Sequence, residues 1–239
     1  MNHIFDLEAE FLQLFESCRT ETMTSIERMY ALYQATCHVL DCEVPGDLAE
    51  CGVWRGGSVM LMAYTLLSRG CTDRTIWLYD TFDGVSMPDD NDVHEMSGRL
   101  ARDILDETER SQDDPFWAVA PRALVESNLR RTRYPMHRFR FVEGDVRATI
   151  PGEAPASLSI LRLDTDWYQS TRHELEQLYP RLSPGGVLIV DDYGYWRGAR
   201  KATDEYFQTV NNRPLLNRID YTGRIGVKPF ERSLTRASA

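Results

Sequence analysis

The chain has 239 residues, of which 42% are hydrophobic and 27% charged, a globular composition that excludes wholesale disorder. Its 37 acidic and 27 basic residues give a net charge of −10, which argues against nucleic acid or an anionic membrane as the main partner. No apolar run approaches the ~20 residues of a membrane span, and the first residues lack the pattern of a signal peptide. The five cysteines form no C-x-x-C pair, so we expect reduced thiols and a cytoplasmic protein.

The beginning of the chain has the pattern of helices. Apolar residues recur at helical spacing through residues 1–43, and Pro45-Gly46 then breaks the pattern. We therefore expect an N-terminal helical extension over residues 1–43, followed by the main domain over residues 44–239.

From residue 47 onward, short apolar strands alternate with helices. Strands are predicted over 47–52, 75–79, 139–143, 158–163 and 187–190, helices over 58–68, 170–182 and 198–209, and a hairpin over 215–228. This alternation predicts an α/β fold with a mostly parallel sheet, a C-terminal antiparallel hairpin and helices on both faces.

The stretch from 83 to 125 is long and rich in Asp and Glu, which is unusual for a connection between two elements. We expect it to be a lid over the functional site. The alternative is a solvated excursion of the chain with no role in binding.

Acidic residues stand at the ends of the predicted strands: Glu50, Asp80, Asp145, Asp164, Asp191 and Asp192. In open α/β sheets, ligands bind outside the carboxyl ends of the strands. Five successive strands that end in carboxylates therefore predict a binding site at this edge.

The segment from Glu50 to Ser58, Glu-Cys-Gly-Val-Trp-Arg-Gly-Gly-Ser, joins a strand to a helix. Gly52 lets the backbone approach a ligand closely, and the N–H groups at the helix start can hold an anionic group such as a carboxylate. The G-x-G-x-x-G fingerprint and the G-K-[ST] phosphate loop are both absent. The alternative is a tight turn without a ligand.

Two further strand-end acids fit a nucleoside. Asp80 can accept hydrogen bonds from both hydroxyls of a ribose, and Asp145 from an adenine amino group. Each has a structural alternative, because Asp is also common in turns and at helix N-termini.

Asp164, Asp191 and Asp192 end two strands that we expect to be neighbours, because the 27 residues that separate Asp164 from Asp191 suffice for one helix and a return strand. Three carboxylates at one rim favour a bound cation, and oxygen ligands suit Mg²⁺ or Ca²⁺. Asp166 lies beside this set without being needed as a ligand, which fits a general base. The alternative is that Asp191 caps the next helix.

The same residues permit a phosphatase interpretation, since D-x-D and a later Asp-Asp also occur in enzymes with an aspartyl nucleophile. Tyr168 stands where such enzymes need Thr or Val, and the chain between Asp166 and Asp191 leaves no room for their phosphate-binding segments. Tyr168, Tyr193 and Trp196 flank the acidic rim, either as core aromatics or as walls of a substrate pocket. Arg162 is expected to pair with the nearby carboxylates.

These motifs resemble the macrocin O-methyltransferase family (TylF/MycF-like), over roughly residues 20–230. The resemblance is carried by Pro45-Gly46-Asp47, Glu50-x-Gly52-Val53-Trp54-Arg55-Gly56-Gly57, Arg162-x-Asp164-x-Asp166, residues 179–186 and Asp191-Asp192-Tyr193. It implies a Rossmann-like class I methyltransferase that uses S-adenosylmethionine and Mg²⁺. Residues 83–125 lie where this family has its substrate-covering lid.

By this resemblance, Asp164, Asp191 and Asp192 are the Mg²⁺ ligands and Asp166 is the catalytic base. From their position beside the acidic rim, we expect Tyr168, Tyr193 and Trp196 at the substrate. The residues expected at the cofactor are Thr22, Met23, Glu50, Gly52, Val53, Trp54, Arg55, Ser58, Asp80, Gly144, Asp145 and Asp164.

The expected activity is methylation of a hydroxyl, such as that of a deoxysugar on a glycosylated natural product. The alternatives are a catechol or another diol as acceptor, or a non-catalytic cofactor-binding homologue. The family resemblance also implies a homo-oligomer.

Overall fold

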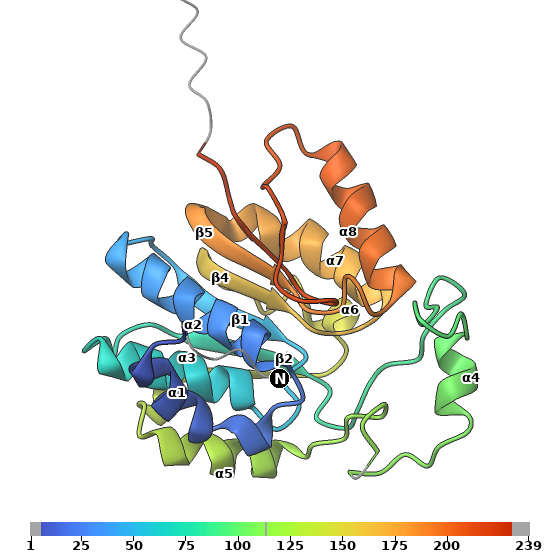
Figure 1. The fold of residues 1–239 in the computed structure, drawn as a ribbon, viewed down its shortest axis with the longest axis horizontal. Coiled ribbons are helices and arrows are strands. Elements are labelled where there is room, and N and C mark those ends of the chain that lie inside the picture. Colours follow the sequence, from blue (N-terminus) through green and yellow to red (C-terminus); the bar gives the residue numbers. More distant parts are fainter. Residues whose placement is uncertain (1–5, 113, 231–239) are drawn as a thin grey trace, which may run out of the picture.

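A computed structural model of the protein describes residues 6–112 and 114–230, and its centre is a seven-stranded sheet in the order β3-β2-β1-β4-β5-β7-β6 (Figure 1). The strands are β1 (Asp47–Cys51), β2 (Ile76–Asp80), β3 (Phe139–Glu143), β4 (Leu158–Leu163), β5 (Leu182–Val190), β6 (Asn217–Arg218) and β7 (Arg224–Val227). Strands β1 to β5 are parallel, whereas β7 runs antiparallel to both β5 and β6. The carboxyl ends of the five parallel strands therefore share one edge.

Helices cover both faces of the sheet (Figure 1). They are α1 (Ala9–Glu16), α2 (Ile26–Asp41), α3 (Gly57–Ser68), α4 (Ala101–Leu105), α5 (Arg122–Thr132), α6 (Val146–Thr149), α7 (Tyr168–Leu178) and α8 (Arg197–Thr209), with short 3-10 turns η1 (Arg19–Glu21), η2 (Met136–Arg138) and η3 (Tyr179–Arg181). One apolar cluster joins α2, α3 and α5 to the sheet, and a second joins α6, α7 and α8 to the opposite face. The predicted fold class is thus confirmed.

The two apolar clusters follow from the strand sequences. In a parallel sheet covered on both sides, successive side chains are buried alternately by the two helical layers. Leu48 and Ile160 belong to the cluster under α2 and α3, whereas their neighbours Ala49 and Leu161 belong to the cluster under α7.

Element boundaries differ from the sequence prediction around Pro180. Helix α7 ends at Leu178 rather than at residue 182, and η3 replaces its last turn. A proline lacks the N–H that would continue the hydrogen bonds of an α-helix, and its ring clashes with the carbonyl one turn earlier. Strand β5 accordingly begins at Leu182, where it pairs with Leu158, instead of at residue 187.

The N-terminal helices are also interrupted. After α1 and η1, the chain has no regular structure until Ser25, whose hydroxyl accepts a hydrogen bond from the N–H of Arg28 and caps α2. Residues 1–5 of the predicted helical extension lie outside the described residues. No helix in the described part of the chain is long and apolar enough to cross a membrane.

Candidate active site

A cavity of about 360 Å³ lies at the carboxyl edge of the parallel strands. All six strand-end acids line it, and so does Asp166. The expected lid contributes to the lining at both of its ends, through Gly84 to Ser86 and through Pro115, Phe116 and Ala118. The sheet edge at which the sequence analysis predicted a binding site therefore contains a cavity.

The loop after β1 is shaped by glycines and held by Asp80. A Cβ on Gly52 would lie 1.9 Å from the backbone oxygen of Asp164, and φ at Gly52 is +82°, so only glycine lets the ends of β1 and β4 meet this closely. The carboxylate of Asp80 accepts hydrogen bonds from the N–H groups of Val53 (2.6 Å), Trp54 (3.1 Å) and Phe82 (2.7 Å). Asp80 therefore fixes the loop that opens toward the cavity.

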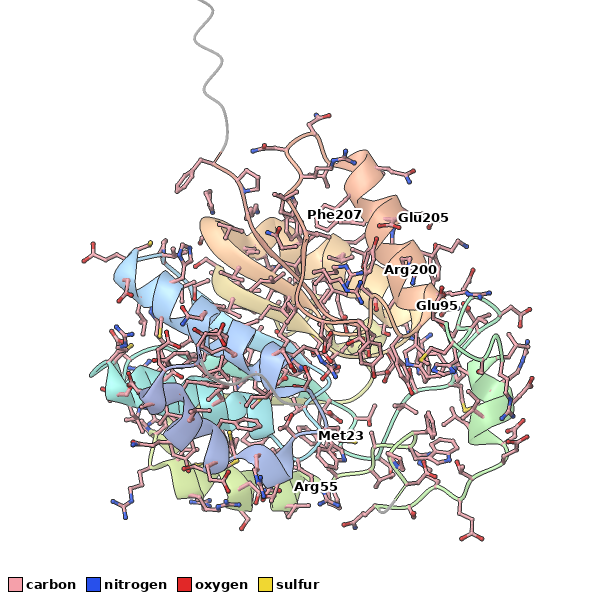
Figure 2. All side chains as sticks on the ribbon, in the orientation of Figure 1. Met23, Arg55, Glu95, Arg200, Glu205 and Phe207 are labelled. Carbon is pink, nitrogen blue, oxygen red and sulfur yellow. The ribbon has the colours of Figure 1, made fainter. Side chains whose placement is uncertain are left out.

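The N-terminal segment before α2 closes one side of the cavity. Thr22 and Met23 both line it, and Met23 is 47% exposed at its rim (Figure 2). Gly57, at the start of α3, packs so closely on this segment that a Cβ would lie 2.5 Å from the carbonyl oxygen of Glu21. Ser58 is buried beside it, with its hydroxyl 3.8 Å from the sulfur of Met29.

Asp164, Asp191 and Asp192 form a compact carboxylate cluster. Each offers one oxygen, and these atoms all lie within 4.8 Å of one another. The register that pairs Leu163 with Val190 brings the ends of β4 and β5 together and so produces this cluster. Asp191 and Asp192 are buried, whereas Asp164 is partly exposed to the cavity.

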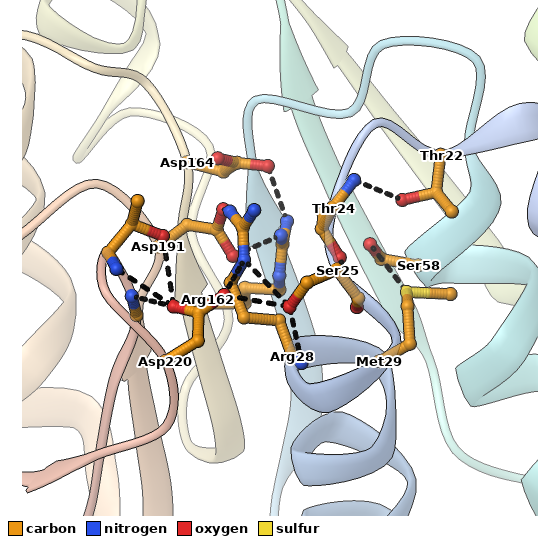
Figure 3. A network of polar contacts seen from close by, with 12 residues as sticks. Thr22, Thr24, Ser25, Arg28, Met29, Ser58, Arg162, Asp164, Asp191 and Asp220 are labelled. Carbon is orange, nitrogen blue, oxygen red and sulfur yellow. Dashed lines mark hydrogen bonds and ion pairs between the residues drawn. The ribbon is translucent and has the colours of Figure 1, made fainter. Parts of the chain in front are cut away.

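Two arginines balance this negative charge (Figure 3). Arg162, which is buried, donates to Glu50, to Asp164 (2.7 Å) and to the Oδ1 of Asp191 (2.6 Å). Arg28, from the first turn of α2, donates to the Oδ2 of Asp191. The pairing of Arg162 agrees with the sequence analysis, but no motif pointed to Arg28.

Carboxylates still outnumber these cations. Burial raises the pKa of Asp191 to about 6 although Arg162 opposes the shift, and burial raises the pKa of Glu50 to about 8, again against the effect of Arg162. The Oε2 of Glu50 is buried and has no hydrogen-bond partner among the described residues. The cavity thus offers unused acceptors to a cationic ligand.

Asp166 is held in a backbone conformation that non-glycine residues rarely adopt, with φ at +65°. The indole Nε1 of Trp196 donates a hydrogen bond of 2.8 Å to its Oδ1. Burial, together with the neighbouring charge of Asp164, raises the pKa of Asp166 to about 8. Strain of this kind concentrates at functional sites, because the surrounding structure must be organised to hold it.

The remaining predicted site residues divide into two groups. Val53, Trp54, Gly144, Asp145 and Trp196 line the cavity, whereas Arg55, Tyr168 and Tyr193 are not among the described residues that line it. The hydroxyls of Tyr168 and Tyr193 donate to Glu205 and Asp204 of α8. Asp145 caps α6 and its carboxylate pairs with Arg147, so this residue has a structural role although it also lines the cavity.

The expected lid is attached to the body of the protein near Asp166. The Oδ1 of the fully buried Asp92 accepts from the N–H of Tyr168 (2.7 Å), and the indole of Trp167 donates to the carbonyl of Ser86 (2.7 Å). A Cβ on Gly198 would lie 1.9 Å from the same oxygen of Asp92, so the start of α8 also fits against it. The sequence analysis did not identify Asp92, because it belongs to no strand end.

A family model for macrocin O-methyltransferases (TylF) matches residues 17–226. The chain belongs to this family. It is therefore an O-methyltransferase, as the sequence resemblance predicted.

Two relatives support this assignment. The chain is 36% identical over 203 residues to the 8-demethyl-8-(2,3-dimethoxy-alpha-L-rhamnosyl)-tetracenomycin-C 4'-O-methyltransferase of Streptomyces olivaceus, covering 84% of this chain and 73% of the relative. It is 35% identical over 202 residues to the demethyldecarbamoylnovobiocin O-methyltransferase of Streptomyces niveus, with the same coverage.

Solved structures agree with the fold of this methyltransferase. The O-methyltransferase NovP superposes with a TM-score of 0.75 at 32% identity, over 88% of this chain and 83% of NovP. The calicheamicin methyltransferase CalS11 superposes with a TM-score of 0.62 at 20% identity, over 92% of each chain.

Proposed function

We propose that this methyltransferase transfers a methyl group from S-adenosylmethionine to a hydroxyl of a deoxysugar on a glycosylated natural product, with the aid of Mg²⁺. The observation that carries the proposal is the arrangement of three aspartates, Asp166 and the glycine loop around one cavity. Membership of the macrocin O-methyltransferase family supports the same reaction.

The residues around the glycine loop suit the methyl donor. The backbone at Gly52 can lie close to a ligand, and the start of α3 faces the cavity through Gly57 and Ser58, which suits the carboxylate of the methionine part. The unpartnered Oε2 of Glu50 suits its ammonium group. Three of the roughly four acceptor positions of Asp80 are used by backbone N–H groups, which leaves capacity for a ribose hydroxyl.

The carboxylate cluster suits a hard divalent cation. Asp164, Asp191 and Asp192 would hold it through oxygen atoms, which Mg²⁺ prefers. When bound, such an ion supplies a Lewis acid that makes an acceptor hydroxyl more acidic.

Asp166 is proposed to take the proton of the acceptor hydroxyl. Its carboxylate faces the cavity beside the aspartates, and the Trp196 indole fixes one of its oxygens, so the other is free to receive the proton. The aromatic rings of Trp167 and Trp196 and the residues of the lid that line the cavity limit the access of water.

The acceptor class is inferred from the relatives. Their names describe methylation of a rhamnosyl-tetracenomycin, of demethyldecarbamoylnovobiocin and of mycinamicin III. A partly exposed apolar rim that includes Met23 and Tyr221 suits the body of such a glycoside. A catechol remains the second candidate, because its adjacent oxygens would present the same geometry to a cation.

The test incubates the protein, S-adenosylmethionine and Mg²⁺ with glycosylated polyketides, aminocoumarins and simple catechols, and measures the gain of one methyl group by mass spectrometry. We expect methylation of glycosides, and loss of at least a hundredfold in rate for Asp166→Asn with unchanged affinity for S-adenosylhomocysteine. Wild-type rates in Asp166→Asn would refute the base, and turnover of catechols alone would refute the glycoside acceptor.

A further inference from the structure

Arg28 connects three parts of the molecule that are far apart in the sequence (Figure 3). It stands on the first turn of α2, and its Nη1 donates to the Oδ2 of Asp191. Its Nε lies 3.0 Å from the Oδ2 of Asp220, in the loop between β6 and β7. The Ser25 hydroxyl donates to the same Asp220 oxygen at 2.7 Å. The Arg28 side chain is only 12% exposed, so this contact is largely shielded from water.

This arrangement leaves Asp191 with a cation on each oxygen. Arg162 takes Oδ1 and Arg28 takes Oδ2, and the side chain of Asp191 is 2% exposed. The two arginines differ in their surroundings. Arg162 also pairs with Glu50 and Asp164, whereas Arg28 divides its charge between Asp191 and Asp220. Arg162 is thus paired with two members of the carboxylate cluster, whereas Arg28 is paired with Asp191 and with a carboxylate in the loop between β6 and β7.

The packing around Arg28 keeps it in this place. A Cβ on Gly223 would lie 3.0 Å from its Cγ and Cδ, so the loop after Asp220 rests directly on its aliphatic part. The Oδ1 of Asp220 accepts from the N–H groups of Thr222 (2.8 Å) and Gly223 (2.7 Å), which fixes that loop. Arg28 is thus a built feature of the site rather than a surface arginine that happens to reach it.

We propose that Arg28 is the counter-ion of Asp191 in the ion-free protein and competes with the divalent cation for this carboxylate. Asp220 is the second carboxylate that binds Arg28 and so weakens this competition. The inference rests on the metal site of the proposed function. It assigns to Arg28 and Asp220 the role of setting the affinity for the ion, which is separate from methyl transfer itself.

The sign of the effect follows from the charges. Without Arg28, the buried carboxylate of Asp191 loses a neighbouring positive charge. This loss destabilises the ion-free protein more than the ion-bound protein, because the bound ion compensates the charge of the carboxylate. Removal of Arg28 therefore favours uptake of the ion. Neutralisation of Asp220 has the opposite effect, because Arg28 then loses the carboxylate that competes with Asp191 for its charge.

The experiment is isothermal titration calorimetry of Mg²⁺ and of Mn²⁺ into metal-stripped full-length protein. For Arg28→Met we expect a Kd at least fivefold lower than that of the wild type. Arg28→Lys keeps the positive charge and should stay within threefold. Asp220→Asn keeps the acceptor for the loop and should raise the Kd at least threefold.

Arg131→Met is the matched control, since Arg131 pairs with Glu21 of the N-terminal segment but does not touch the aspartates. Its Kd should stay within twofold. An unchanged or higher Kd for Arg28→Met overturns the inference. If Arg28→Met does not fold, the Kd of Asp220→Asn is the deciding measurement. An unchanged or lower Kd for Asp220→Asn then overturns the inference. Wild-type protein that takes up neither ion refutes the metal site as well, whereas ion uptake with the wrong sign in the variants refutes Arg28 alone.

Discussion

The close approach of Gly52 to Asp164 predicts an unequal response of two glycines to the same substitution. Gly52 and Gly70 have φ of +82° and +70°, so alanine at either costs about 1 kcal/mol of backbone strain. A Cβ on Gly70 meets nothing within 4 Å, whereas a Cβ on Gly52 would lie 1.9 Å from a backbone oxygen. Overpacking against backbone adds about 1–3 kcal/mol. Gly52→Ala should therefore lose about 3 kcal/mol and Gly70→Ala about 1.

Urea denaturation followed by circular dichroism measures both values, and calorimetry with S-adenosylhomocysteine and Mg²⁺ measures the consequence for the site. Because the clash displaces the backbone of Asp164, we expect Gly52→Ala to weaken the binding of both ligands at least tenfold, and Gly70→Ala to leave their binding unchanged. Equal destabilisation by the two substitutions would show that the contact between the ends of β1 and β4 is not what requires glycine.

Three further outcomes follow from buried polar groups. Arg162→Met leaves buried carboxylates without their cation and should lower the free energy of unfolding by about 3–5 kcal/mol at pH 7, measured in urea. Burial raises the pKa of Glu174 from 4.5 to about 8, so the free energy of unfolding falls as pH rises between these values. Glu174→Gln should reduce that fall by a few kcal/mol. The same pH dependence in the variant and the wild type would contradict the effect of burial. Trp196→Phe removes the donor to Asp166 and should reduce kcat about tenfold in steady-state assays, with unchanged S-adenosylhomocysteine affinity as the control.

The sequence predicted the sheet and the carboxylate cluster for the same reason. Parallel strands leave a regular apolar pattern, and their carboxyl ends meet at one edge, so the acids that follow them must be neighbours. Asp164 and Asp191 could therefore be placed together from their strands alone. The position of Arg162 inside a strand, next to those acids, was sufficient to predict its ion pairs.

Contacts between distant segments could not be predicted in this way. Arg28 reaches Asp191 across 163 positions in the chain, and only the packed orientation of α2 brings them together. Asp92 lies in a segment without a helical or strand pattern of apolar residues. Its hydrogen bond with the backbone N–H of Tyr168 could therefore not be predicted from the sequence. The direction of a tyrosine side chain in a turn was equally undetermined, and the hydroxyl of Tyr193 donates to Asp204 of α8.

The attachment of residues 86–95 has a consequence for how acceptor preference can diverge among related enzymes. Ser86 and Asp92 bind the turn that carries Asp166, and Glu95 lies beside Arg200 of α8 (Figure 2). Substitutions in this stretch would therefore disturb the position of Asp166, which we propose as the base. Among the described residues from 96 to 116, none makes a hydrogen bond to this turn, although α4 packs against Trp167 and Trp196. We therefore expect differences in acceptor preference to arise in that portion, which contributes Pro115 and Phe116 to the cavity, rather than in residues 86–95.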